Sequence, residues 1–230
     1  MSGKKITFHI KRFKPGRIDP PQYQNFDIEV LQHMTVLDCL EIIRLEQDSS
    51  LMYRHSCHHS SCGTCACNIN ETEGLACTTR VHQLHTEVIA LAPLNDFACL
   101  GDLVVDMQEF FGAFSEDWTY LKAVENPAAS KMPPGIKQFT RFENCIECGA
   151  CVSACPVNQK RRFIGPAALA AINNELQKHP QYHEKLITLA GSKRGVKLCE
   201  QALNCSRVCP TGVYPARHIS DLRKILKENI

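Results

Sequence analysis

Cysteine is the residue type in this 230-residue chain best suited to chemistry, and eleven of the 14 cysteines fall into three regularly spaced groups. The first group comprises Cys57, Cys62, Cys65 and Cys77, in the pattern C-x4-C-x2-C-x11-C. This spacing is typical of loops in which four thiolates surround two irons. Ser60, Ser61 and Gly63 leave backbone amides free to hydrogen-bond sulfur. The pattern predicts a 2Fe–2S cluster, with a structural zinc site as the alternative.

The second group has the spacing C-x2-C-x2-C-x3-C-P and is made of Cys145, Cys148, Cys151, Cys155 and Pro156. In this run the fourth cysteine ligates the other cluster of a pair. The third group, Cys199, Cys205 and Cys209, repeats the run with Ala202 in place of its second cysteine.

If the fourth cysteine of each run ligates the cluster held by the other run, the ligands of both clusters can be predicted. A 4Fe–4S cluster takes Cys145, Cys148, Cys151 and Cys209. The remaining thiolates, from Cys155, Cys199 and Cys205, number only three because alanine has no donor atom. We therefore expect a 3Fe–4S cluster there, with a labile 4Fe–4S cluster carrying water or hydroxide on its open iron as the alternative.

The other cysteines and the nearby histidines fit no ligand pattern. We expect Cys39, Cys67 and Cys99 to be buried small hydrophobes. His55, His58 and His59 flank the first group, and histidine replaces cysteine in Rieske centres. Since four cysteines already fill the site, we expect these histidines to be solvated or to lie behind the ligands.

The elements around the first group predict an α+β domain. Residues 6–10 and 26–30 alternate apolar and polar side chains, which indicates a hairpin with Gly16–Pro21 as its turn. Thr35 and Asp38 form a capping-box-like start to a helix. Strands near Ala66–Ile69 and Val88–Leu91 follow, with a turn at Glu71–Gly74 between them.

From Asp106 onward the pattern becomes helical. Helices are predicted after Gly165-Pro166, with proline at the first position, and over Pro215–Glu228. Asn126–Gly135 reads as a loop. We place the domains at 1–105 and 106–230.

The net charge of +2 and the ordinary composition give no sign of a nucleic-acid partner. No segment approaches the roughly 20 apolar residues of a membrane span. The N-terminus lacks the apolar core of a signal peptide, so we expect a chain that stays in the cytosol. Clustered cysteines in a reducing compartment point to metal rather than to disulfides.

Over nearly its whole length the chain resembles the iron–sulfur subunits of succinate dehydrogenase and fumarate reductase. The matching features are Ser56-Cys57-x4-Cys62-Gly63-x-Cys65, Leu75-Ala76-Cys77, the run from Cys145 to Pro156, Phe163-Ile164-Gly165-Pro166-Ala167-Ala168, and Cys199-x5-Cys205-x3-Cys209-Pro210. The resemblance implies an N-terminal β-grasp ferredoxin domain with 2Fe–2S and an all-α helical ferredoxin domain with 4Fe–4S and 3Fe–4S.

The resemblance also implies partners. A flavoprotein subunit with covalent FAD interconverts succinate and fumarate, and electrons pass through the clusters to a quinone near a membrane anchor, expected to be of cytochrome b type. The chain itself would carry no catalytic residue, and it would lie peripherally on the cytoplasmic side of the membrane. Lys160, Arg161 and Arg162 would be a solvated face or would contact the anchor or lipid headgroups.

Three departures from ubiquinone-linked members favour menaquinone or a different type of anchor. No tryptophan follows Pro156, and the only tryptophan is Trp118; Glu200 follows Cys199 where histidine is frequent; and Asn173-Asn174 replace an aromatic–arginine pair. The residues expected on the quinone side are Pro156, Glu200, Ala202 and Arg223. For Arg223, a plain helix-surface position is the alternative.

The resulting hypothesis is an electron-transfer subunit of a succinate:quinone or quinol:fumarate oxidoreductase. The first alternative keeps the clusters but changes the partners, as in thiol-linked fumarate reductases or glycolate oxidase-type complexes with a cysteine-rich subunit. The second is an iron–sulfur sensor that binds DNA or a regulator. The sequence does not distinguish succinate oxidation from fumarate reduction.

Overall fold

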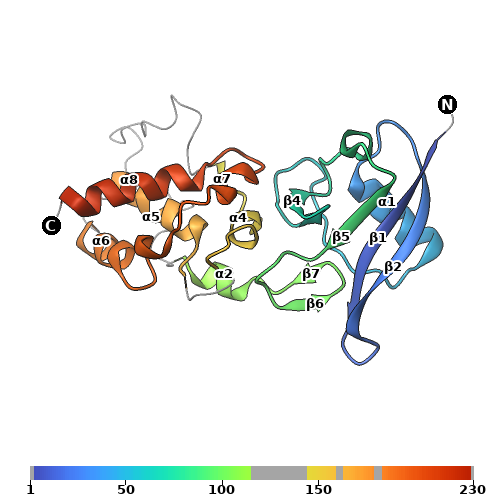
Figure 1. Cartoon of the computed structure of the whole chain (residues 1–230), viewed down its shortest axis with the longest axis horizontal. Coiled ribbons are helices and arrows are strands. Elements are labelled where there is room, and N and C mark those ends of the chain that lie inside the picture. The colour runs from blue at the N-terminus through green and yellow to red at the C-terminus, as the bar shows by residue number, and fades with distance from the viewer. Residues whose placement is uncertain (1–2, 115–143, 159–162, 179–182, 229–230) are drawn as a thin grey trace. The chain divides into compact units, whose positions relative to one another are not determined.

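The N-terminal part of the chain folds as a mixed sheet with a helix on it (Figure 1). The computed structural model describes residues 3–114, 144–158, 163–178 and 183–228. The loop expected at Asn126–Gly135, Trp118, and the basic residues Lys160, Arg161 and Arg162 lie outside the described residues.

The chain divides into two compact units. The first comprises Met1–Met107 together with the short segment Ile146–Ser153. The second comprises the described residues of Gln108–Cys145 and Ala154–Ile230. A single domain boundary near residue 105 stays a prediction. The division into compact units shows in addition that eight residues of the second cysteine run, Ile146–Ser153, pack with the first unit.

Five strands form the sheet of the first unit, in the order β2-β1-β5-β3-β4. They are β1 (Lys4–Lys14), β2 (Ile18–Val30), β3 (Ala66–Ile69), β4 (Thr72–Leu75) and β5 (Val88–Ala92). The pairs β1–β2, β3–β4 and β3–β5 are antiparallel, whereas β1 and β5 run parallel. The sheet is therefore mixed, and with helix α1 (Val36–Ile42) it forms the α+β domain that the sequence predicted.

Apolar alternation places one face of the hairpin in the core. Ile6, Phe8 and Ile10 are buried, and Phe8 pairs with the buried Phe26 across the strands. Helix α1 packs against the same core with its apolar side chains, including Leu37 and Leu40. The predicted capping box at its start is confirmed: Thr35 Oγ1 accepts from the Asp38 amide at 3.2 Å, and Asp38 Oδ2 accepts from the Thr35 amide at 2.8 Å.

Two turns differ from the sequence-based expectation. The predicted turn over Gly16–Pro21 is wrong in extent because β2 already begins at Ile18. Pro20 and Pro21 are tolerated in this strand since β2 lies at the sheet edge. The turn predicted at Glu71–Gly74 is also displaced. The chain reverses at Asn70 and Glu71, both with positive φ, and so leaves room for β4.

A buried carboxylate fixes the start of the first cysteine loop. Asp102 is fully buried, between the short strands β6 (Cys99–Gly101) and β7 (Val104–Val105). Its Oδ2 accepts from the Met52 amide at 2.8 Å, and its Oδ1 accepts from the Phe13 amide at 2.9 Å. Arg12 Nε lies 3.1 Å from the same Oδ1, so the negative charge is paired.

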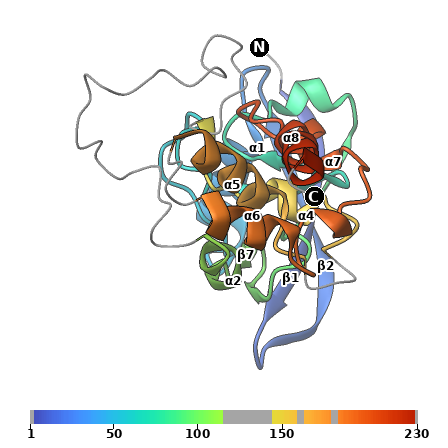
Figure 2. The same ribbon diagram turned by 90° about the vertical axis from the view of Figure 1, so that its left-hand side faces the viewer.

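The second unit is helical, as predicted. In the described residues its elements are α2 (Gln108–Gly112), α5 (Pro166–Lys178), α6 (His183–Gly191), η7 (Val196–Leu198), α7 (Asn204–Arg207) and α8 (Pro215–Glu228). Helices α5 and α8 lie side by side in both views (Figures 1 and 2). Their contact buries Leu169, Ile172 and Leu222. The remaining short elements, all in the first unit, are η1 (Ile43–Gln47), η2 (Val81–Leu84) and α4 (Ala150–Ser153).

Candidate metal centres

The loop between α1 and β3 surrounds the sulfur of Cys57 with backbone donors. The amides of Ser61 and Cys62 donate to Cys57 Sγ at 3.2 and 3.3 Å, and that of His59 at 3.5 Å. These N–H groups, that of His59 foremost, lower the pKa of the Cys57 thiol to about 7. Several N–H donors on one sulfur suit the thiolate that an iron–sulfur cluster requires.

The hairpin of β3 and β4 brings together Cys65 and Cys77, the last two cysteines of the first group. Cys65 directly precedes β3 and Cys77 follows β4 by two residues, so both lie where the two strands open. The Ala76 amide donates to the Cys65 carbonyl at 3.2 Å, which extends the pairing as far as these cysteines. Burial raises the pKa of the Cys65 thiol to about 12, with the neighbouring Cys77 contributing. A buried thiol of this kind becomes a thiolate only against a positive ion.

Gly63 lets this loop approach the second cysteine run very closely. Its φ is +70°, and a Cβ built there would lie 2.6 Å from the Ile146 carbonyl oxygen and 2.9 Å from Cys148 Cβ. Only glycine fits such a contact without displacement of the backbone. The loop of the first group therefore packs directly against Cys148, inside the first unit.

Polar contacts of buried groups hold the segment Ile146–Ser153 in the first unit. Ser153 Oγ donates to Glu73 Oε1 at 2.8 Å and accepts from the Asn95 amide at 2.7 Å. Glu73, on β4, and Ser153 are both buried. This contact could not be predicted from the sequence because the three residues are far apart in the chain. It holds α4, and with it Cys151, in a defined place.

Cys145 and Cys209, the outer members of the predicted 4Fe–4S set, belong to the second unit. Both pack against a small cluster formed by Ala170, Ala171 and Val213. The Val213 amide donates to Cys209 Sγ at 3.3 Å. The side chain of Cys209 thus also has a backbone donor of the kind that stabilises a thiolate.

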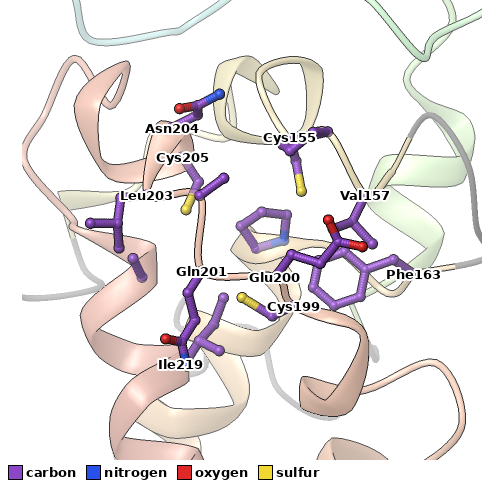
Figure 3. Close-up of a pocket in the computed structure, with 14 residues that line it drawn as sticks. Cys155, Val157, Phe163, Cys199, Glu200, Gln201, Leu203, Asn204, Cys205 and Ile219 are labelled. Atoms are coloured by element: carbon purple, nitrogen blue, oxygen red, sulfur yellow. The ribbon is translucent and has the colours of Figure 1, made fainter.

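The third set of cysteines lines one pocket in the second unit. Figure 3 shows the sulfur atoms of Cys155, Cys199 and Cys205 facing a common space. Burial raises the pKa of the Cys205 thiol to about 11, and the adjacent Cys155 and Cys199 add to this shift. The other residues lining the pocket are Pro156, Val157, Phe163, Pro166, Glu200, Gln201, Ala202, Leu203, Asn204, Ala216 and Ile219.

Three of the residues expected on the quinone side, Pro156, Glu200 and Ala202, line this pocket. The fourth, Arg223, instead supports it through the backbone. Arg223 Nη2 donates to the carbonyls of Val196, at 3.1 Å, and Cys199. Asn204 Nδ2 donates to the Ala154 carbonyl at 3.2 Å and so joins the two cysteine runs. Neither contact has a signal in the sequence spacing.

The remaining cysteines are of two kinds. Cys39 and Cys67 are buried in the core as expected, and burial raises the pKa of each thiol to about 12. Cys99 is only partly buried, because it lies on the short strand β6 near the surface, which corrects the expectation for this residue.

Comparison with known proteins agrees with this arrangement. A family model described as a 2Fe-2S iron-sulfur cluster binding domain matches residues 7–112, and one described as a 4Fe-4S dicluster domain matches residues 141–213. The chain is 30% identical to succinate dehydrogenase [ubiquinone] iron-sulfur subunit 1, mitochondrial, of Oryza sativa subsp. japonica, over 96% of this chain and 82% of that protein. The corresponding subunit of Candida glabrata is 31% identical, over 96% of this chain and 90% of that protein. The chain belongs to the family of succinate dehydrogenase iron–sulfur subunits.

Solved structures give the same fold. A chain of the Mycobacterium smegmatis Sdh1 complex in the apo form has a TM-score of 0.81 at 20% identity, covering 99% of this chain and 97% of that one. A hypothetical protein from Helicobacter pylori has a TM-score of 0.62 at 18% identity, covering 98% of this chain and 40% of that one. The predicted fold class, a 2Fe–2S ferredoxin-like domain followed by a helical ferredoxin domain, is confirmed.

Membership of this family makes the chain an electron-transfer iron–sulfur subunit that carries a 2Fe–2S and a 4Fe–4S cluster. The cysteines present fit such groups, since they meet at sites with backbone donors and thiols close to one another. Among the described residues, no helix has the length and apolar character needed to cross a bilayer.

Proposed function

We propose that this subunit relays single electrons between a flavoprotein subunit that holds FAD and a quinone site at a membrane anchor. The observation that carries this proposal is the pocket where Cys155, Cys199 and Cys205 meet, with Ala202 on its wall. Three thiolates and one residue without a donor atom suit a 3Fe–4S cluster. Such a third carrier would extend the path from the 2Fe–2S and 4Fe–4S clusters toward the quinone.

The ligand assignment follows the three cysteine groups. Cys57, Cys62, Cys65 and Cys77 hold the 2Fe–2S cluster in the domain of residues 1–105. Residues 106–230 supply the other two sets: Cys145, Cys148, Cys151 and Cys209 for 4Fe–4S, and Cys155, Cys199 and Cys205 for 3Fe–4S. The contact of Gly63 with Cys148 supports a short path between the first two centres.

The residues of the chain position and tune these carriers rather than transform a substrate. When bound, the clusters each take up and release one electron at a time. The amides around Cys57 favour its thiolate and the more reduced, more negative state. Arg223 holds the carbonyl of Cys199, which fixes the backbone from which that ligand projects.

Family membership supports the proposed partners and setting, as follows. The complex is an oxidoreductase that acts on the CH–CH group of succinate with a quinone as acceptor, and its catalytic residues lie in the flavoprotein. The anchor is of cytochrome b type, and the subunit lies peripherally on the cytoplasmic side of the membrane. Menaquinone is favoured because Glu200 occupies the pocket wall where ubiquinone-linked relatives often carry histidine.

Iron analysis and electron paramagnetic resonance (EPR) test this proposal. Protein purified without oxygen is expected to hold about nine irons per chain, namely two, four and three. The oxidised protein is expected to show the spin signal of a 3Fe–4S cluster. About ten irons with no such signal would replace the third centre by a 4Fe–4S cluster. Two irons together with bound zinc would contradict the assignment of the C-terminal half.

A further inference from the structure

Three side chains that no cluster uses gather beside the loop of the first cysteine group. Glu41 projects from the end of α1, and His55 and His58 stand on either side of Cys57 in the sequence. His55 Nδ1 lies 3.1 Å from His58 Nε2. Glu41 Oε1 lies 3.6 Å from the first nitrogen and 3.8 Å from the second. The three ligand atoms all lie within 4.8 Å of one another, which is close enough for them to bind a single ion.

The spacing of these three atoms matches a metal coordination sphere. Zinc binds histidine nitrogen at about 2.0–2.1 Å with tetrahedral angles, which sets neighbouring ligand atoms about 3.3 Å apart. The three observed separations fall on both sides of this value. Without an ion, the same contacts amount to one hydrogen bond between two imidazoles and a nearby carboxylate. A small ion at their centre would bind all three atoms at once.

The surroundings hold the two imidazoles in place. Tyr53 packs against His55 with ring centroids 5.5 Å apart, and His55 meets His58 edge to face at 5.2 Å. The guanidinium of Arg44 lies over the Tyr53 ring, 5.8 Å from the ring centroid. His58 itself has a φ of +61°, a conformation that is uncommon for a residue other than glycine.

We propose that Glu41, His55 and His58 bind one divalent transition-metal ion of the zinc class, with water completing the coordination. Two imidazoles and one carboxylate suit Zn²⁺, Co²⁺ or Ni²⁺, whereas Mg²⁺ and Ca²⁺ prefer oxygen ligands only. The side chains remain between a third and a half exposed, so an ion can reach them from solvent.

The position of the site gives it a consequence for electron transfer, which rests on the proposed role of Cys57 as a 2Fe–2S ligand. A doubly positive ion held by residues flanking Cys57 favours the more negative, reduced state of the adjacent centre. Bound Zn²⁺ therefore raises the reduction potential of that centre. In this way the ion concentration tunes the first carrier without touching its ligands.

Zinc binding to the purified, cluster-replete complex tests the site directly. The wild type is expected to retain one more Zn²⁺ per chain than the Glu41→Gln or the His58→Gln variant, with a full iron content in all three. Zinc X-ray absorption is expected to show nitrogen and oxygen neighbours near 2.0–2.1 Å. Loss of one ligand is expected to weaken this binding by about tenfold or more. The exposed His33→Gln and Glu46→Gln variants serve as controls and are expected to bind like the wild type.

The outcomes separate the site from the cluster assignment. Equal zinc binding by the wild type and both site variants would overturn the proposal, as would a sulfur shell near 2.3 Å accompanied by loss of iron. In a redox titration followed by the EPR signal of the reduced 2Fe–2S centre, zinc is expected to shift the midpoint upward in the wild type but not in Glu41→Gln. Binding without a shift would overturn the coupling. Absence of any 2Fe–2S signal would instead contradict the proposed function, and the binding result would still be readable.

Discussion

At the scale of single residues, Ala202 decides what the third centre holds. It stands where the repeated run would place a second thiolate, and it lines the pocket where Cys155, Cys199 and Cys205 meet. The loop that carries it turns through Gln201 and Leu203, both in the left-handed region, with φ of 61° and 64°. This path brings the short side chain of Ala202 to the wall of the pocket. A side chain with a donor atom at this position would change the ligand count.

The Ala202→Cys substitution is expected to complete the set of four thiolates. The 3Fe–4S signal of the oxidised protein should diminish, and iron should rise by about one per chain. The added thiolate makes the centre more negative, so its reduction potential should fall. Electron flow from succinate to quinone should then slow, while reduction of a dye that accepts electrons at the flavin should persist. EPR, iron analysis and the two activity assays check these outcomes.

Gln201→Cys provides the matched control for this substitution. It adds a thiol to the same pocket wall, one residue away from the C-x2-C-x2-C spacing. We expect it to leave both the signal and the iron content unchanged. If Ala202→Cys behaves in the same way as this control, the side chain at position 202 does not face the open corner of the centre.

How far sequence reasoning reached at this scale depended on the range of each interaction. The cysteine groups could be predicted because a cluster imposes fixed short intervals on its ligands. The roles of Arg223 and Ser153 could not be predicted. Arg223 reaches a carbonyl 24 positions away, and Ser153 meets a carboxylate 80 positions away. Contacts of this kind follow from the packing of whole elements, which no local spacing encodes.

At the scale of elements, the contact between the first cysteine loop and the segment Ile146–Ser153 depends on Gly63. The backbone there has a positive φ, and the space beside it is taken by Ile146 and Cys148. Gly149 of the same segment also has a positive φ and packs against Phe97 and Met107. Two glycines thus permit the close fit of this segment in the first unit.

Gly63→Ala is expected to lower the stability of the protein and to separate these two segments. A positive φ alone costs roughly 1–2 kcal/mol for an alanine. The added Cβ must also displace backbone atoms, so the total loss in free energy of unfolding should exceed that value. Thermal unfolding of the cluster-replete protein measures the stability, and the magnetic coupling between the reduced 2Fe–2S and 4Fe–4S centres measures their separation.

Gly16→Ala isolates the effect of the contact from that of the backbone conformation. Gly16 has the same φ of +70°, but no atom lies within 4 Å of the Cβ that alanine would add. We expect this variant to lose only the conformational part of the stability and to keep the magnetic coupling. Equal losses in the two variants would mean that the approach of the loop to Cys148 is not tight.

Periodicity predicted the long elements and the short strand β3, but it missed strand β4. The buried face of β1, the capped start of α1 and both bounds of α8 were recognisable because each extends over several repeats of its period. Strand β4 was missed because it has four residues and follows a turn of only two. The boundaries of β2 were misjudged because an edge strand accepts the prolines that normally mark a turn.

At the scale of the whole molecule, the two units divide the work of a relay. The first unit holds the loop of Cys57 and the inner cysteines of the second run, and the second unit holds the pocket of Cys155, Cys199 and Cys205.

Removal of this chain from cells that contain the complex is therefore expected to uncouple its two half-reactions. The flavoprotein alone should still reduce an artificial dye with succinate, because that reaction needs only the flavin. Reduction of quinone by succinate should fall to background, because no carrier then joins the flavin to the membrane. The flavoprotein should also move from the membrane fraction to the soluble fraction, since the peripheral link to the anchor is lost.

Reintroduced wild-type chain should restore both properties, whereas a chain with Cys57, Cys148 and Cys205 all replaced by serine should not restore quinone reduction. Quinone reduction that persists without the chain would contradict its role as the relay.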